Sequence, residues 1–214
     1  MIIGLVGFIG SGKGTAGDIL NTEYGYAKDS FARPLKDAVA SIFGWDRVML
    51  EGDTHDSRQW REKRDEFWSN KFGFDFTPRQ ALQLMGTEAG RNVFHKDVWV
   101  ISLLQRNQNR DVVVTDVRFK NEVQALHDAG GIIVRVRRGP EPDWYQVAEA
   151  ANTETGDLQA VALASMMFSK IHSSEWDWIG CHINHTIYND GTLADLKDNV
   201  RYLVENQNVL LTSL

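Results

Sequence analysis

The chain carries a glycine-rich segment near its start whose spacing is suited to phosphate binding. GFIGSGKGT runs from Gly7 to Thr15, and Lys13 directly follows the second of two glycines that have four residues between them. Glycines let backbone N–H groups converge on phosphate oxygens, and the helix expected to follow directs its positive end at them. Lys13 would add a positive charge near the β- and γ-phosphates of a nucleotide. We therefore predict a phosphate-binding loop and not a glycine-rich turn with an incidental lysine.

One position of this loop departs from the strict pattern, which has Ser or Thr directly after the lysine to reach a magnesium ion. Here Gly14 follows Lys13, and the hydroxyl comes one residue later, on Thr15. The ending GSGKGT resembles the loop of nucleoside monophosphate kinases. The resemblance implies that Mg²⁺ is held largely through water near Thr15, whose hydroxyl faces phosphate.

A second group of polar residues lies at the end of the apolar run DVVVTD, over 111–116, which is expected to be a strand. Asp116 ends this run and could hold magnesium-bound water or orient an attacking oxygen, and the alternative is a helix N-cap. Arg118 and Glu122 come next, four residues apart on one helix face. They are either a weak surface ion pair or, beside a phosphate site, an anion-binding arginine with its neighbour.

Further candidates lie between residues 30 and 100. Lys36 follows the second expected strand, and Arg79 lies in the first turn of a helix that begins with Thr77, Pro78 and Gln80. This trio predicts a capping box with proline in the first turn. Because anions bind well at helix starts, Lys36 and Arg79 are candidate phosphate ligands.

Trp99 and three arginines each have two interpretations. Trp99 is either a core residue or a flat surface on which a nucleobase stacks. Arg58, Arg61 and Arg64 lie in a charged connection, and for Arg61 and Arg64 we favour a solvated helix face.

HSSE, over 172–175, either contacts a phosphate or caps a helix. The six histidines are scattered and no Cys-x-x-Cys occurs, so we predict no protein-built metal cluster.

The elements that must position these residues alternate along the chain. Apolar runs predict strands over 1–6, 26–32, 111–116, 132–138 and about 181–188. Helical patterns cover 13–20, 34–44, a segment from 77, 97–105, most of 141–170 and a segment from 192, whereas 52–76 shows no clean periodicity. This alternation predicts a parallel sheet with helices on both faces. The glycine loop, Ser30, Asp116 and Asn189 would then lie at the carboxyl ends of strands, where such sheets bind ligands.

Length and composition set limits on the class of protein. The chain has 214 residues, of which 43% are hydrophobic, so it can bury the core of one α/β domain. The net charge of -6 argues against a broad basic surface for nucleic acid. A single cysteine cannot form an intrachain disulfide, which fits a reducing cytoplasm. No apolar run approaches the length of a membrane span.

The motifs together resemble those of bacteriophage-type deoxynucleoside monophosphate kinases, within the P-loop nucleoside monophosphate kinase superfamily. The matching segments follow the family's order and cover well over half of the chain: GFIGSGKGT, SFARPLKDA, TPRQALQLMGTEAGR, DVWV, VVVTDVRFKNEVQALHDAGGIIVRVRRG, HSSE and IYNDGTLADL. PRQ…GTE and TDVRFKNE are much more specific than the loop, which many kinases share.

The resemblance implies one α/β P-loop kinase domain over 1–214, with a substrate-binding helical region about 45–108 and a helical insertion about 139–171. Its catalytic residues would be Lys13, Asp116 and Arg118. Its ATP-binding residues would be Gly10, Ser11, Gly12, Lys13, Gly14, Thr15 and Asn189. Its substrate-binding residues would be Lys36, Arg58, Arg79, Gly86, Thr87, Trp99, Asp116, Arg118 and Glu122, with Arg58 the weaker match. Members of the family often have only a short link between the segments that match RRG and HSSE, where this chain has the insertion. The insertion is expected to be either a lid or a docked surface hairpin.

The activity implied is transfer of the γ-phosphate of ATP to a deoxynucleoside monophosphate, with Mg²⁺ as cofactor and no metal bound directly by the protein. Expected partners are ATP and deoxynucleoside monophosphates, without a nucleic acid polymer or a membrane, and a homodimer is left open. The expected location is the cytoplasm, which for a phage protein is that of the host. The alternatives are another small-molecule P-loop kinase, of the dephospho-coenzyme A or phosphomevalonate type, and a non-catalytic nucleotide-binding switch. A DNA-handling ATPase fits the acidic net charge poorly.

Overall fold

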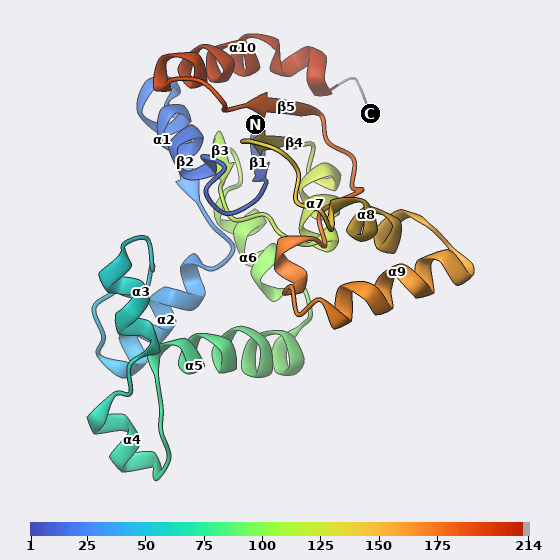
Figure 1. The fold of residues 1–214 in the computed structure, drawn as a ribbon. Helices are drawn as coiled ribbons and strands as arrows, with labels where there is room; N and C mark the ends of the chain where they lie inside the picture. Colours follow the sequence, from blue (N-terminus) through green and yellow to red (C-terminus); the bar gives the residue numbers. More distant parts are fainter. Residues whose placement is uncertain (212–214) are drawn as a thin grey trace. The chain divides into compact units, whose positions relative to one another are not determined.

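The computed structural model describes residues 1–211, with side chains placed as far as residue 207. These residues form two compact units, each visible in Figure 1. The sheet unit comprises Met1–Ser30 and the chain from Asn107 onward, and the helical unit comprises Phe31–Arg106. The helical unit therefore begins earlier than the region predicted about 45–108, and the organisation as one domain stays a prediction.

The sheet unit is built on five parallel strands in the order β2-β3-β1-β4-β5. Their bounds are Ile2–Val6 for β1, Ala27–Asp29 for β2, Val112–Val114 for β3, Ile132–Arg137 for β4 and His185–Tyr188 for β5. Every residue of β3 is buried, as expected for a central strand covered on both faces. The predicted parallel sheet is confirmed, although β2 and β5 are shorter than their apolar runs.

Helices cover both faces of this sheet, which gives three layers (Figure 1). On one face, Ile3 and Leu5 of β1 join a core with α1 (Lys13–Tyr24) and α10 (Leu193–Leu211). On the other face lies α7 (Lys120–Asp128), and a Cβ on Gly4 would stand 2.6 Å from Leu126 Cδ1 of that helix. The glycine in β1 thus allows α7 to pack close to the sheet.

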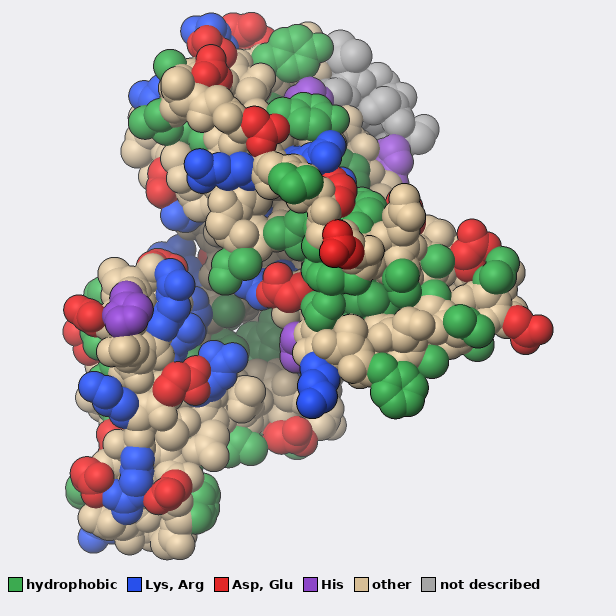
Figure 2. All heavy atoms as spheres, viewed as in Figure 1, with side chains coloured by type: hydrophobic (Ala, Val, Ile, Leu, Met, Phe, Trp, Pro, Cys, Tyr) green, Lys and Arg blue, Asp and Glu red, His purple; other side chains and the backbone are tan. Residues whose placement is uncertain are grey.

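The predicted insertion is a helical hairpin made of α8 (Tyr145–Thr153) and α9 (Gly156–Phe168). Ala148 and Ala151 of α8 are buried. Asn152 donates hydrogen bonds from Nδ2 to the carbonyl oxygens of Trp176, at 3.0 Å, and of Ile179, at 2.8 Å. The hairpin is therefore docked on the loop that follows it. Its exposed surface carries hydrophobic side chains, green in Figure 2, among them Leu158, Val161, Met167 and Phe168.

The helical unit contains α2 (Arg33–Phe43), α3 (His55–Glu62), α4 (Glu66–Phe72), α5 (Pro78–Gln83), η1 (Leu84–Phe94) and α6 (Val98–Arg106). For 52–76 the sequence predicts a connection with some helix, and the structure places the two short helices α3 and α4 there. Thr54 caps α3 by accepting from Ser57 N at 3.1 Å, and Asp65 caps α4 by accepting from Trp68 N at 2.9 Å. These short helices are stabilised by a shared hydrophobic core. Its buried members are Val39, Leu50, Phe76 and Ala81, and the partly buried Phe43, Trp45, Trp60 and Trp68 pack against them.

The predicted capping box at the start of α5 is confirmed. Gln80 N donates to Thr77 Oγ1 at 3.1 Å, and Thr77 N donates to Gln80 Oε1 at 2.9 Å. The helix then continues into η1, which is wound as a π-helix. A π-helix of this length is rare, and such segments are frequent at functional sites. Within the described part of the chain, no helix combines the length and the apolar character that a membrane crossing requires.

Candidate functional site

The glycine-rich loop joins β1 to α1, and two of its glycines leave room for other parts of the chain. Gly7 has φ 138° and Gly12 has φ 102°, values that L side chains rarely adopt. A Cβ on Gly7 would collide with the carbonyl oxygen of Val136, and one on Gly12 would collide with the side-chain amide of Asn189. The conformation of the loop and its close neighbours therefore both require glycine at these two positions.

Lys13 lies at the end of this loop with its ammonium turned back toward the backbone. Nζ donates to the carbonyl oxygens of Gly7, at 2.6 Å, and Phe8, at 2.8 Å. Burial, and then the positive charge of Arg118, lower the pKa of Lys13 to about 8, while the carboxylate of Glu175 opposes them. An anion bound at this loop would favour the charged ammonium and raise this pKa.

Asn189 follows β5 and ties that end of the sheet to the loop. Its Nδ2 donates to Ser11 O at 2.9 Å, and its backbone N donates to Arg137 O at 2.8 Å. Ser11 is buried, and its hydroxyl has no hydrogen-bond partner among the described residues. A buried hydroxyl without a partner calls for an explanation, and a phosphate oxygen would supply the missing bond.

Asp116, Arg118 and Glu122 follow β3, which is the neighbour of β1 in the sheet. The buried carboxylate of Glu122 accepts hydrogen bonds from the backbone N–H groups of Arg118, at 2.8 Å, and Phe119, at 3.1 Å. Arg118 extends its guanidinium toward Glu175, with Nη1 3.5 Å from Oε1. Glu122 thus fixes the backbone that carries Arg118, and HSSE supplies the carboxylate that faces it.

The donor atoms at this end of the sheet fit a magnesium ion that is held mainly by phosphate and water. No group of three or more His, Cys, Asp or Glu residues in the described part of the chain could hold a metal ion. Mg²⁺ commonly keeps several waters and binds one or two carboxylates together with substrate phosphates. The half-buried Asp116 offers a carboxylate, while Thr15 and the unpartnered Ser11 offer hydroxyls.

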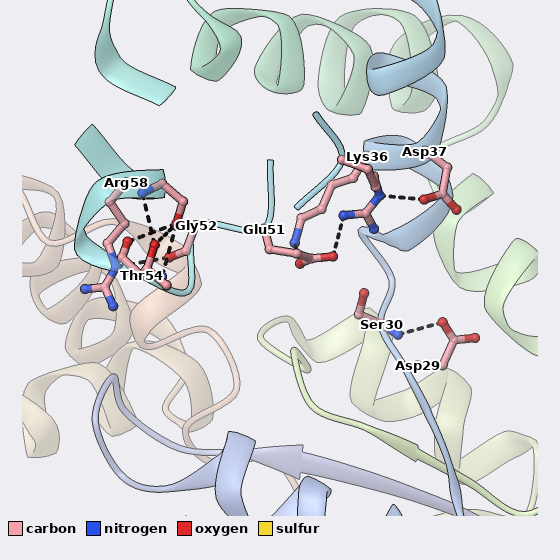
Figure 3. A network of polar contacts seen from close by, with 10 residues as sticks. Asp29, Ser30, Lys36, Asp37, Glu51, Gly52, Thr54 and Arg58 are labelled. Atoms are coloured by element: carbon pink, nitrogen blue, oxygen red, sulfur yellow. Dashed lines mark hydrogen bonds and ion pairs between the residues drawn. The ribbon is translucent and has the colours of Figure 1, made fainter. Parts of the chain in front are cut away.

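In the helical unit, the mostly buried side chain of Lys36 is held by the carboxylate of Glu51 (Figure 3). Its Nζ donates to Glu51 Oε2, and Arg47 Nη1 donates to Oε1 of the same carboxylate. Burial alone would raise the pKa of Glu51, but the hydrogen bonds and charges of Lys36 and Arg47 outweigh it and hold that pKa below its usual value. A ligand that uses Lys36 must share it with Glu51.

Three arginines of the helical unit gather on α3 and α5. Arg79 Nη1 lies 3.1 Å from Glu62 Oε1, with both side chains largely exposed. Arg58 donates from Nε to Gly52 O at 3.0 Å (Figure 3). Arg61, which the sequence placed on a solvated face, is half-buried, and its Nε has no hydrogen-bond partner among the described residues. The spacing of Arg58 and Arg61, three residues apart on one helix, is the signal that could have indicated this cluster.

Trp99 is held against the π-helical segment. Its Nε1 donates to Gly86 O at 2.9 Å, and a Cβ on Gly90 would stand 2.5 Å from its Cζ2. The indole is half-buried. Thr87, next to Gly86, is exposed. The structure thus brings Trp99 into contact with Gly86, while a role of Gly86, Thr87 and Trp99 in binding substrate stays a prediction.

Comparison with known proteins gives relatives of one kind. The chain is 32% identical, over 152 residues, to a protein of Acanthamoeba polyphaga mimivirus assigned as a deoxynucleotide monophosphate kinase, and the match covers 64% of this chain and 74% of the relative. It is 46% identical over 55 residues to the deoxynucleoside-5'-monophosphate kinase of Escherichia phage T5, which covers 24% of this chain and only 22% of that relative. No protein-family model matches the chain.

Solved structures with a similar fold are more distant. The dephospho-CoA kinase of Campylobacter jejuni has a TM-score of 0.48 at 14% identity, with 96% of each chain covered. The shikimate kinase of Aquifex aeolicus has a TM-score of 0.45 at 14% identity, covering 98% of this chain and 99% of the other. These scores are too low to indicate a shared function.

Proposed function

Because the chain belongs to the deoxynucleotide monophosphate kinase family, we propose that it transfers the γ-phosphate of ATP to a deoxynucleoside monophosphate, giving ADP and the deoxynucleoside diphosphate. The observation that carries this proposal is the ammonium of Lys13, which is bound by two loop carbonyls next to the unpartnered hydroxyl of Ser11. Transfer of this kind depends on alignment and charge neutralisation more than on covalent chemistry.

The donor nucleotide would bind in the sheet unit. The N–H groups over Gly10–Thr15 and the ammonium of Lys13 would hold the phosphates, and Asn189 would lie near the adenine while it supports the loop through Ser11 O. Mg²⁺, bound through ATP and water near Thr15 and Asp116, would supply positive charge to the reacting phosphates. Lys13, Asp116 and Arg118 are the proposed catalytic residues.

The acceptor would be recognised by charge and by stacking. We assign its phosphate to the cations Lys36, Arg58, Arg79 and Arg118, because guanidinium and ammonium groups neutralise a dianion. Gly86, Thr87 and Trp99 would contact the nucleoside, with the indole as the flat surface. For Glu122, the two hydrogen bonds that it accepts support a role in orienting Arg118, and direct contact with substrate stays a prediction.

The setting of the enzyme is part of the same proposal. Its partners would be ATP and deoxynucleoside monophosphates, without a nucleic acid polymer or membrane, in the cytoplasm of the cell or phage host. A homodimer is left open.

The proposal is tested by measuring ADP release with ATP, Mg²⁺ and each deoxy- and ribonucleoside monophosphate in turn. At least one deoxynucleoside monophosphate should stimulate ADP release well above the level with ATP alone. Dephospho-coenzyme A and phosphomevalonate serve as competing acceptors. Phosphorylation of either of them, with no response to any nucleoside monophosphate, would overturn the proposal in favour of another small-molecule kinase.

A further inference from the structure

Arg61 has a setting unlike that of its neighbouring arginines. Its side chain is half-buried on α3, and its Nε is shielded from solvent without a hydrogen-bond partner in the described part of the chain. Arg58 bonds to the carbonyls of Gly52 and Asp53, Arg64 to Asp75 and Glu66, and Arg79 to Glu62. A shielded guanidinium N–H without a partner is costly unless a ligand completes it.

The charges around Arg61 are mixed: two arginines and two carboxylates act on its guanidinium. Burial lowers the pKa of Arg61, and the positive charges of Arg79 and Arg58 lower it further. The carboxylates of Glu62 and Asp53 act in the opposite direction. The carboxylate of Glu62 is already engaged with Arg79. Three guanidinium groups therefore gather near two carboxylates, and an anionic ligand would relieve their repulsion.

The local backbone builds a place for the Arg61 side chain. Gly52 has φ 72°, and a Cβ at that position would collide with the Arg61 guanidinium. The guanidinium therefore lies directly against the Gly52 backbone, and Arg58 fixes the same turn by donating to Gly52 O. Because the side chain is held before any ligand arrives, little rotamer entropy remains to be lost on binding.

We propose that Arg61, together with Arg79, binds the phosphate group of the acceptor nucleotide. A phosphate monoester carries up to two negative charges and three acceptor oxygens. Two of these oxygens can accept parallel hydrogen bonds from one guanidinium, and the remaining charge can be neutralised by a second arginine. The inference rests on the proposed function and adds Arg61 to the acceptor site, where the motifs did not place it.

The test is calorimetric titration of Arg61→Met and of the matched control Arg64→Met. Arg64 lies on the same segment, is exposed, and has carboxylate partners of its own. Each protein is titrated with the deoxynucleoside monophosphate that the wild type uses best, with the corresponding deoxynucleoside, and with ATP. Arg61→Met should weaken monophosphate binding roughly ten- to a hundredfold, the range for a lost charge-assisted contact. Its affinity for the deoxynucleoside and ATP should match that of Arg64→Met.

Two results would overturn the inference: equal monophosphate affinity in the two variants, or a loss for Arg61→Met that is the same for the deoxynucleoside as for the monophosphate. If Arg61→Met does not fold, Arg61→Lys keeps the charge but not the fork, and it should show an intermediate loss confined to the monophosphate. A wild type that binds no nucleoside monophosphate would instead refute the proposed function. The two failures are therefore distinguishable.

Discussion

The carboxylate of Glu141 accepts two hydrogen bonds from Nη2 of Arg135, at 2.7 and 2.6 Å. This pair joins β4 to the segment that leads into α8. The Arg135 guanidinium also lies between 5.0 and 6.0 Å from the ring centroids of Phe8, Tyr145 and Trp178. Phe8 belongs to the glycine-rich loop, and its carbonyl oxygen holds Lys13. The insertion is therefore attached to the phosphate-binding loop through Arg135.

Glu141→Gln should lower the free energy of unfolding by about 3 kcal/mol, because it leaves the Arg135 charge buried without its counterion. The Arg135 side chain is only 13% exposed, so solvent screens the lost interaction poorly. Urea denaturation measures the change. Asp198→Asn, which removes an exposed ion pair with Arg201, is the control and should change stability by less than about 0.5 kcal/mol. Equal effects of the two substitutions would show that the Arg135 pair contributes no more than a surface pair.

The docked insertion should behave as a fixed part of the sheet unit and not as a lid. The hydrogen bonds of Asn152 and the ring contact of Phe8 with Trp144, at 5.4 Å, hold α8 without any ligand. Limited proteolysis within 139–171 should therefore proceed at the same rate with and without a bisubstrate analogue. Strong protection by the analogue would show that the hairpin closes on the nucleotide.

ATP binding should take up a proton at pH values just above 8. The pKa of Lys13 is about 8 without nucleotide, so a growing fraction of the side chain is neutral as pH rises through that value. The ATP phosphates favour the ammonium and raise this pKa, so binding draws a proton from the buffer. Calorimetry in buffers of different ionisation enthalpy measures the uptake. Lys13→Met should abolish it, and a wild type whose binding heat is independent of the buffer would contradict the assignment of Lys13.

Gly90→Ala should impair use of the acceptor more than use of ATP. The added methyl group would displace the Trp99 ring, since its carbon would stand 2.5 Å from Cζ2. Overpacking of this kind costs about 1–3 kcal/mol in stability. Steady-state kinetics of the folded variant should show a raised KM for the deoxynucleoside monophosphate and an unchanged KM for ATP. Gly73→Ala is a destabilised control that displaces no side chain, because its φ of 79° strains alanine while nothing lies within 4 Å of the added Cβ. Unchanged kinetics in a destabilised Gly90→Ala would make Trp99 a core residue only.

The parts of the fold that the sequence predicted well are those with a strong local signal. A buried parallel strand such as Val112–Val114 is a continuous β-branched run, and the boxes at Thr77 and Thr192 are short motifs with their own hydrogen bonds. The setting of Arg61 could not be predicted in this way. It depends on the conformation of Gly52 and on the charge of Arg79, which only the folded chain brings near.

The bounds of the two short helices within 52–76 could not be predicted in this way either. Trp60 and Trp68 belong to α3 and α4, and neither helix is long enough to show a clear period. Their apolar faces pack with Phe43, Trp45 and Phe76, which lie at other places in the chain.

Arg79→Met should weaken use of the acceptor roughly ten- to a hundredfold in kcat/KM and barely change ATP affinity. Its ion pair with Glu62 is exposed, so the substitution should cost little stability. Arg79→Lys should recover only part of the loss, because lysine lacks the planar fork. Should ATP affinity fall while the acceptor KM stays constant, Arg79 would belong to the donor site.

Phosphorus NMR of the wild-type reaction with ATP, Mg²⁺ and a deoxynucleoside monophosphate tests the central claim most directly, because it observes both products. The account predicts ADP and the deoxynucleoside diphosphate in equal amounts, with product formation slowed by orders of magnitude in a folded Lys13→Ala variant. ADP with inorganic phosphate and no deoxynucleoside diphosphate would contradict it, since the protein would then hydrolyse ATP without transferring phosphate to a nucleotide.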